Sequence, residues 1–179
     1  SKNLELGLTG DYEWGNVELK LYKSKVTDAF TYFTATGPDY YKNDGTVNIQ
    51  GVELSLGTEF LGWNLDSSVD FNKAIAASTD LQKGRRPNRS ISLNLSKTSG
   101  KWKRNINWVA KSWAWDKDAH TNDVKLGGYG LLNLSTSYDF TENLTVYLNR
   151  NNALDKDYEM ARGYSILGNT STLGLTFTF

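Results

Sequence analysis

The sequence predicts an all-β protein: one antiparallel up-and-down transmembrane β-barrel domain of about nine strands, spanning residues 1–179. Three observations carry this prediction. Apolar and polar residues alternate with a period of two from end to end, and aromatic residues make up 13% of the chain. The connections between these segments are alternately short and long along the chain. This arrangement is typical of membrane-spanning barrels.

Composition removes several function classes. The chain has 20 Lys and Arg against 20 Asp and Glu, and this zero balance argues against nucleic-acid binding, which requires a clustered excess of cations. The absence of cysteine excludes disulfides, thiolate zinc sites and cysteine nucleophiles. The sequence has no apolar run of about 20 residues and no charged-plus-apolar leader, so we expect neither a transmembrane helix nor a signal peptide.

The first half of the chain predicts four strands. Alternation is clearest over residues 3–9, 17–22, 47–60 and 63–71. Gly51 shifts the phase of this alternation between Ile49 and Val52. We therefore expect a bulge or a bend at Gly51.

The second half predicts five more strands. They cover residues 91–96, 102–110, 132–138, 144–148 and 173–179. Two of them extend well beyond their clearest alternation, over residues 101–115 and 125–140. A strand that crosses a membrane needs roughly 9–11 residues, whereas strands average about 5–6. Strand length therefore favours a membrane barrel over a sandwich.

The connections predict two different rims. Tight turns are expected near Gly15, Gly62, Gly100 and Glu142, and long polar loops near Pro38, Gly84, His120 and Gly163. Because consecutive connections of an up-and-down sheet lie at opposite ends, all the tight turns should share one rim and all the long loops the other.

Alternation also predicts which residues face lipid. The expected lipid-facing set is Leu6, Leu19, Leu54, Leu65, Leu93, Ile106, Leu134, Val146 and Leu175. The expected lumen-facing set is Glu18, Glu53, Asp66, Asn94 and Asn149. Lipid, or detergent in its place, is therefore a predicted partner, and the unpaired edges of a sheet in a membrane also predict pairing with a second copy.

A soluble alternative remains open at this point. The same alternation fits a soluble barrel or sandwich that binds glycans through exposed aromatic residues. Trp102, Trp108, Trp113 and Trp115 would then form a stacking platform, whereas in a barrel they belong to an interfacial girdle or to ordinary packing. Solubility without detergent separates the two hypotheses.

Several segments resemble one family of receptors. Residues 1–8 (SKNLELGL) resemble an SKxxExG strand, and residues 49–53 (IQGVE) resemble an I-x-GVE strand. Arg85-Arg86-Pro87 resembles an RxP motif before a strand, and residues 151–158 (NNALDKDY) resemble an NNLFDKxY signature. Gly163-Tyr164 with Gly168 resembles the approach to the last strand. In this order, these segments resemble the C-terminal part of the barrel of TonB-dependent outer-membrane receptors.

The resemblance implies a location and a function. It implies the bacterial outer membrane and uptake of cobalamin or a ferric siderophore, with the cobalamin receptor as the nearest likeness. Leu175, Phe177 and Phe179 resemble the terminal signal that the barrel assembly machinery binds. Ligand contacts are expected on the long-loop rim, from Tyr40, Tyr41, Trp115 and Tyr164.

The chain also departs from that family. The resemblance implies a 22-stranded barrel with a plug in its lumen, whereas about nine strands and no plug domain are expected here. This chain alone would therefore not carry out gated transport. Arg104 and Arg150 fall among apolar residues, where a cation at mid-bilayer costs roughly 2–4 kcal/mol. These positions predict either strand ends or an excised or engineered fragment.

No catalytic, metal or cofactor site is predicted. Asp116, Asp118 and His120 share a loop but lack the pattern of a metal site. Residues 155–157 lack the spacing of a calcium loop. The carboxylates of the polar face have no pocket in which to act as acid and base. We therefore expect a protein that is not an enzyme.

Overall fold

The computed structural model describes residues 1–33, 40–118 and 122–179. Its strands are β1 (Lys2–Tyr12), β2 (Gly15–Phe33), β3 (Tyr40–Phe60), β4 (Trp63–Ala76), β5 (Leu81–Gln82), β6 (Arg89–Ser99), β7 (Trp102–Lys111), β8 (Ala114–Lys117), β9 (Asp123–Leu126), β10 (Tyr129–Asp139), β11 (Leu144–Asn151) and β12 (Thr170–Phe177). Within the described residues, no helix is long and apolar enough to cross a membrane.

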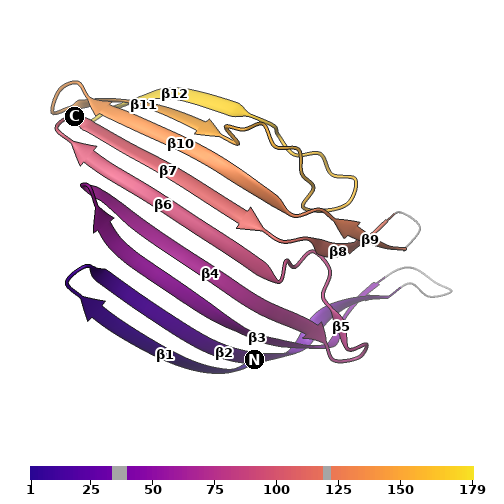
Figure 1. Ribbon diagram of the computed structural model, residues 1–179. Coiled ribbons are helices and arrows are strands. Elements are labelled where there is room, and N and C mark those ends of the chain that lie inside the picture. Colours follow the sequence, from indigo (N-terminus) through magenta and orange to yellow (C-terminus); the bar gives the residue numbers. More distant parts are fainter. Residues whose placement is uncertain (34–39, 119–121) are drawn as a thin grey trace.

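Nine long strands form one curved antiparallel sheet (Figure 1). Their order is β1-β2-β3-β4-β6-β7-β10-β11-β12, so each long strand pairs with the next along the chain. β5 adds to the end of β4, and β8 and β9 form a separate hairpin. The predicted all-β, up-and-down architecture is therefore confirmed. β1 and β12 are the two edges of the described sheet, and they run in the same direction because eight reversals separate them.

The two rims differ as the sequence predicts. Tight turns of two to four residues join the strands at one end, over residues 13–14, 61–62, 100–101 and 140–143. Leu61 and Gly62 have φ angles of 52° and 71°, which is the positive pair that a type I′ hairpin turn requires. The long loops lie at the opposite end, together with β5 and the β8–β9 hairpin (Figure 1). Pro38 and His120 fall outside the described residues.

Strand pairing separates an apolar face from a polar face. Directly paired residues share a face, and the pairs Leu6–Leu21, Leu19–Leu54, Leu93–Trp108, Ile106–Leu134 and Val146–Leu175 run across the sheet. All nine residues of the expected lipid-facing set lie on this face, which we call the outward face. Glu18, Glu53, Asp66, Asn94 and Asn149 lie on the other, the inward face.

The molecule has almost no conventional core. Among the residues whose burial the structure describes, the buried apolar ones are Val47, Ala74, Ala114 and Leu126. On the outward face, by contrast, Leu6 is 59% and Leu175 is 69% exposed. On the inward face, side chains bridge neighbouring strands, for example Tyr22 Oη to Asp70 Oδ1 at 2.8 Å. An exposed apolar face of this extent needs an apolar environment, because monomeric soluble proteins rarely expose patches beyond a few hundred Å².

The bulge expected at Gly51 is wrong. Pairing runs without a shift through Gly51, and the irregularity lies in β2 between Val26 and Phe30. Gly51 instead makes room for a neighbour, because a Cβ there would collide with the ring of Tyr22 and lie 2.7 Å from the carbonyl oxygen of Phe71. The phase of the alternation changes because Ile49 is an apolar residue on the inward face.

Three further element boundaries differ from the expectation. The strand expected over residues 101–115 ends at Lys111 and resumes as β8, and the one expected over 125–140 is divided into β9 and β10. β2 and β3 continue past the expected strands into the region predicted as loop. The long rim therefore contains regular structure of its own.

Candidate functional site

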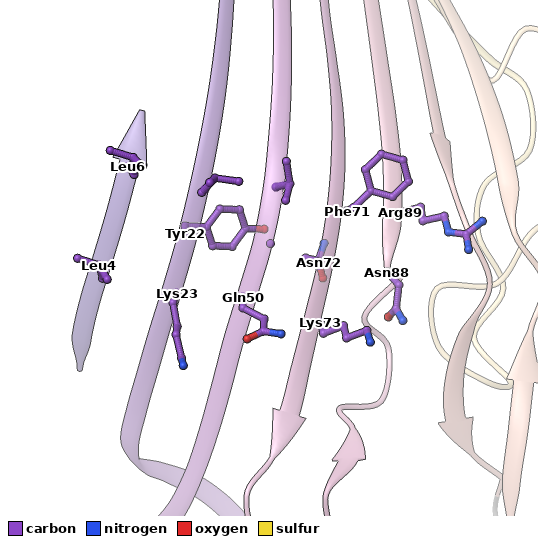
Figure 2. Close-up of a pocket in the computed structure, with 13 residues that line it drawn as sticks. Leu4, Leu6, Tyr22, Lys23, Gln50, Phe71, Asn72, Lys73, Asn88 and Arg89 are labelled. Atoms are coloured by element: carbon purple, nitrogen blue, oxygen red, sulfur yellow. The ribbon is translucent and has the colours of Figure 1, made fainter. Parts of the chain in front are cut away.

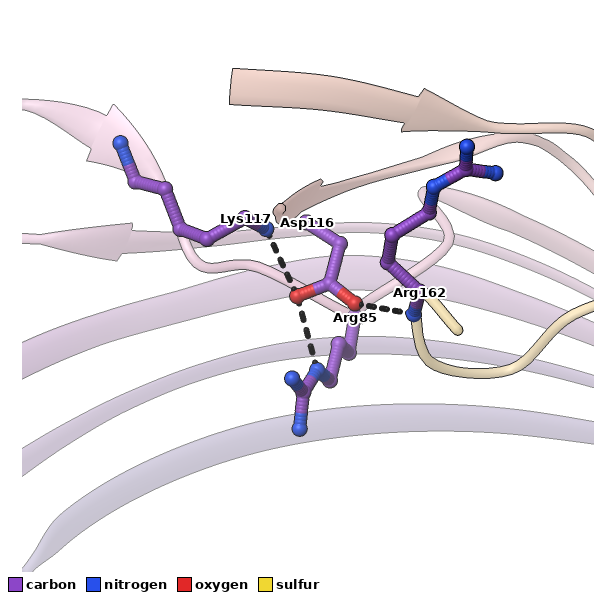
Figure 3. A network of polar contacts seen from close by, with 4 residues as sticks. All are labelled: Arg85, Asp116, Lys117 and Arg162. Atoms are coloured by element: carbon purple, nitrogen blue, oxygen red, sulfur yellow. Dashed lines mark hydrogen bonds and ion pairs between the residues drawn. The ribbon is translucent and has the colours of Figure 1, made fainter. Parts of the chain in front are cut away.

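The long-loop rim is organised around one buried carboxylate. Asp116, on β8, is 6% exposed. Its Oδ1 accepts hydrogen bonds from Arg85 Nε and the Lys117 amide, both at 2.8 Å. Its Oδ2 accepts one from the Arg162 amide at 2.7 Å, so three donors converge on one side chain (Figure 3). We call Arg85, Asp116, Lys117 and Arg162 the Asp116 cluster.

The Asp116 cluster joins three loops that are distant in sequence. Arg85 lies between β5 and β6, Asp116 in the β8–β9 hairpin and Arg162 in the segment after β11. The Arg85 amide also donates to the carbonyl oxygen of Trp115 at 2.7 Å. The hairpin is thus held to the loops on both sides of it.

The charge state of Asp116 follows from these contacts. Burial of the carboxylate acts to raise its pKa, but the amides of Arg162 and Lys117 and the guanidinium of Arg85 outweigh burial and lower the pKa below its usual value. Asp116 is therefore an anion at neutral pH, and its hydrogen bonds are charge-assisted.

The segment after β11 is stabilised by its own polar residues. Asn152 is buried and has a φ of 47°. Its side chain donates to the Lys156 carbonyl oxygen at 3.0 Å and accepts from the Lys156 amide at 2.9 Å. Asp155 Oδ1 accepts from the Asn169 amide at 2.8 Å. The NNALDKDY segment thus closes a compact loop, and its Asp155 carboxylate accepts a hydrogen bond from a backbone amide.

A polar groove lies beside this loop. Its volume is about 490 Å³, and it is lined by the end of β9, by Gly127 and Gly128 between β9 and β10, and by residues of the segment 156–168. Lys125, Lys156 and Arg162 line it together with Asp157 and Glu159. Lys125 Nζ also lies 4.5 Å from the centroid of the Trp113 ring. Cations and an aromatic surface at the rim can hold an anionic or ring-bearing molecule.

The four expected ligand-binding residues all lie toward this rim. Trp115 is 40% and Tyr164 is 69% exposed, and the Asp116 cluster holds their two segments together. Tyr40 and Tyr41 pair with Phe33 and Tyr32 at the far end of the β2–β3 ladder. The described contacts therefore join the segment of Trp115 to the loop of Tyr164. Tyr40 and Tyr41 lie apart from them, at the end of the β2–β3 hairpin.

Sequence reasoning missed the centre of this arrangement. It singled out Arg85 only as part of an RxP motif and Asp116 only as a weak metal ligand. Asp118, the second candidate ligand, accepts instead from the amide of Asn122 at 2.9 Å. Among the described residues, no three His, Asp or Glu side chains gather as metal ligands would. No local signal pairs Arg85 with Asp116, because 31 positions separate them.

The outward face is layered along the strands. Six of its aromatic residues gather at the tight-turn rim: Tyr12, Phe60, Trp63, Trp102, Tyr138 and Phe177. Phe71 and Trp108 lie farther along their strands. Leucine, isoleucine and valine dominate the middle. Arg104 is the third residue of β7 and lies 5.4 Å from the Trp102 ring centroid, and Arg150 is the next-to-last residue of β11. Both arginines thus lie near strand ends, where a cation costs little.

Comparison with known proteins identifies the family. The family described as TonB dependent receptor-like, beta-barrel matches residues 1–153. The chain is similar in structure to the ferripyoverdine receptor of the outer membrane of Pseudomonas aeruginosa, with TM-score 0.73, 17% identity and coverage of 98% of this chain and 26% of that one.

Two further solved structures are similar. The copper transporter OprC has TM-score 0.76 at 20% identity, over 99% of this chain and 32% of that one. The FrpB iron transporter from Neisseria meningitidis has TM-score 0.76 at 16% identity, over 99% and 30%. This chain therefore spans between a quarter and a third of the length of these structures. The chain belongs to the TonB-dependent receptor-like β-barrel family of the bacterial outer membrane.

Proposed function

We propose that this chain forms part of the barrel wall of a receptor that takes up a metal chelate across the outer membrane. In this proposal the outward face contacts lipid, the inward face lines the lumen, and the long-loop rim binds the ligand outside the cell. The observation that carries the proposal is a family match over residues 1–153 on a sheet with one mainly apolar and one mainly polar face.

The proposed ligand is an iron chelate of the siderophore class. Support comes from the ferripyoverdine receptor and the iron transporter among the similar structures. The cations that line the polar groove, and the Trp113 ring next to Lys125, also support it. OprC makes a copper species the second candidate. Cobalamin stays a prediction from sequence resemblance.

We further propose that the nine strands are an arc of a larger barrel. Backbone groups at an open edge cost several kcal/mol each in lipid, so β1 and β12 require partners, either further strands of the same barrel or a second copy of the chain. Leu175 and Phe177 share the outward face of β12, and together with Phe179 they form the proposed signal for the assembly machinery.

Uptake by living cells tests the proposal. A strain lacking the gene is compared with the wild type for accumulation of radiolabelled ferric siderophore, copper and cobalamin, with and without TonB. We expect loss of ferric siderophore uptake in the deletion strain and the same loss without TonB. Unchanged uptake of all three would contradict the proposal, and loss of cobalamin uptake alone would move the ligand class to cobalamin.

A further inference from the structure

The outward face carries a charge asymmetry that uptake does not explain. Along the paired positions of the nine long strands, up to the irregularity in β2, it holds no Asp or Glu; the acids lie inward, at Glu5, Asp11, Glu18, Glu53, Glu59, Asp66, Asp70 and Asp139. Lysine and arginine do occur outward, and five of them gather at the long-loop end of the first strands: Lys2, Lys23, Lys25, Lys73 and Arg89. We call these five residues the basic belt.

The basic belt lies at one depth. Lys73 stands ten residues after Trp63, where β4 begins, and Lys2 stands ten residues before Tyr12, where β1 ends. Ten residues at a rise of about 3.3 Å and a tilt of about 45° span roughly 23 Å. The apolar band of an outer-membrane barrel is about 25 Å tall. The belt therefore marks the level of the outer headgroups, if the outward face contacts lipid as proposed above.

The belt has no counter-charge of its own. Lys2 and Lys25 are directly paired across β1 and β2, which is unfavourable for two like charges. Within the described residues, none of the five belt side chains forms an ion pair. Anions supplied from outside the chain would remove this repulsion.

An apolar hollow lies directly against the belt. It has a volume of about 590 Å³, and Leu4, Leu6, Leu21, Val52 and Phe71 form its apolar lining. Figure 2 shows Lys23, Gln50 and Lys73 in one line across β2, β3 and β4, with Arg89 beside Phe71. Cations thus border a hollow large enough for hydrocarbon chains.

We propose that this surface binds a phosphate-bearing lipid of the outer leaflet. Its acyl chains would lie against Leu6, Leu21 and Phe71, and its phosphates would lie between Lys23, Lys73 and Arg89. Lys23 and Lys73 are two strands apart, which places their backbones about 10 Å from each other. That spacing suits a headgroup with more than one phosphate, and arginine suits the bidentate binding of one of them.

Native mass spectrometry in mild detergent tests the proposal. The full-length protein is titrated with lipid A that carries two phosphates, and with the same lipid after enzymatic dephosphorylation. We expect the triple variant Lys23→Gln, Lys73→Gln, Arg89→Gln to bind phosphorylated lipid A about tenfold more weakly. Dephosphorylated lipid should bind wild type as weakly as phosphorylated lipid binds the variant.

Two control proteins separate charge from fold. Lys97→Gln, Lys101→Gln, Arg104→Gln removes the same charges at the opposite, tight-turn rim, and Lys23→Arg, Lys73→Arg, Arg89→Lys keeps the belt basic. Both should bind as wild type does. If the first triple variant does not reach the membrane, Lys73→Gln alone is measured and should still weaken binding. Wild-type binding by the triple glutamine belt variant and by Lys73→Gln, or equal binding of dephosphorylated and phosphorylated lipid to the wild type, would overturn the proposal whatever the outcome of the uptake assay.

Discussion

The carboxylate of Asp116 connects separate segments of the long-loop rim. Asp116 receives hydrogen bonds from three donors in three separate parts of the sequence. A buried carboxylate costs free energy unless such partners satisfy it. Because Asp116 binds the loops of Arg85 and Arg162, its substitution should also destabilise these two loops.

Asp116→Asn should loosen these loops. The amide keeps the size of the side chain but loses the charge and one acceptor oxygen, and we expect a local loss of about 1–3 kcal/mol. Hydrogen exchange should become faster at the amides of Arg85 and Arg162. The matched control is Asp123→Asn, because the ion pair of Asp123 with Lys117 is exposed and contributes little. Equal effects of the two substitutions would contradict this role.

The same residue gives the rim a pH dependence. Because the pKa of Asp116 is lowered in the folded protein, its stabilisation is complete above its unfolded pKa of about 3.9 and is lost as the pH falls through the lower folded value. Exchange at the Arg162 amide, corrected for intrinsic rate, should therefore rise below about pH 4 in the wild type. In Asp116→Asn this rise should be absent.

Gly51 tests packing on the inward face. Gly51→Ala places a methyl group against Tyr22 and the Phe71 carbonyl oxygen, and such overpacking costs typically 1–3 kcal/mol. Gly7→Ala is the control, because Gly7 lies on the same face with nothing within 4 Å of the added Cβ. Urea unfolding in lipid vesicles measures both. Equal stability of the two variants would show that the ring of Tyr22 moves aside freely.

At the scale of elements, alternation predicts faces better than boundaries. A period of two places every second residue on one face wherever pairing is regular, and all nine residues of the expected set share a face for this reason. Strand ends and the β8–β9 hairpin depend on contacts such as Arg85 with Asp116, which join distant positions. Local pattern contains no information on such contacts.

Leu134→Arg should destabilise the outward face. Leu134 is the sixth of the eleven residues of β10, so an arginine there would lie far from either rim. We expect a loss of about 2–4 kcal/mol in lipid vesicles. Ser135→Arg, one residue along on the inward face, should cost less than about 1 kcal/mol. If Leu134→Arg unfolded at the same urea concentration as the wild type, the outward face would not contact hydrocarbon.

At the scale of the whole molecule, the proposed position in a membrane requires partners for both edges of the described sheet. Backbone amides along the free edge of β1 should exchange slowly in the membrane, because unpaired amides are not tolerated in lipid. Hydrogen exchange of the protein in vesicles checks this. Exchange of the β1 amides at the solvent rate would contradict both edge pairing within a larger barrel and pairing with a second copy.

The orientation of the sheet's two faces is the central claim, and spin labels at single cysteines test it most directly. The chain has no cysteine, so each substitution gives one defined label. In lipid vesicles, labels at Leu19, Leu54 and Leu134 should collide with oxygen and be shielded from a water-soluble nickel complex. Labels at Glu18, Glu53 and Ser135 should show the reverse, and loss or inversion of this alternation would contradict the account.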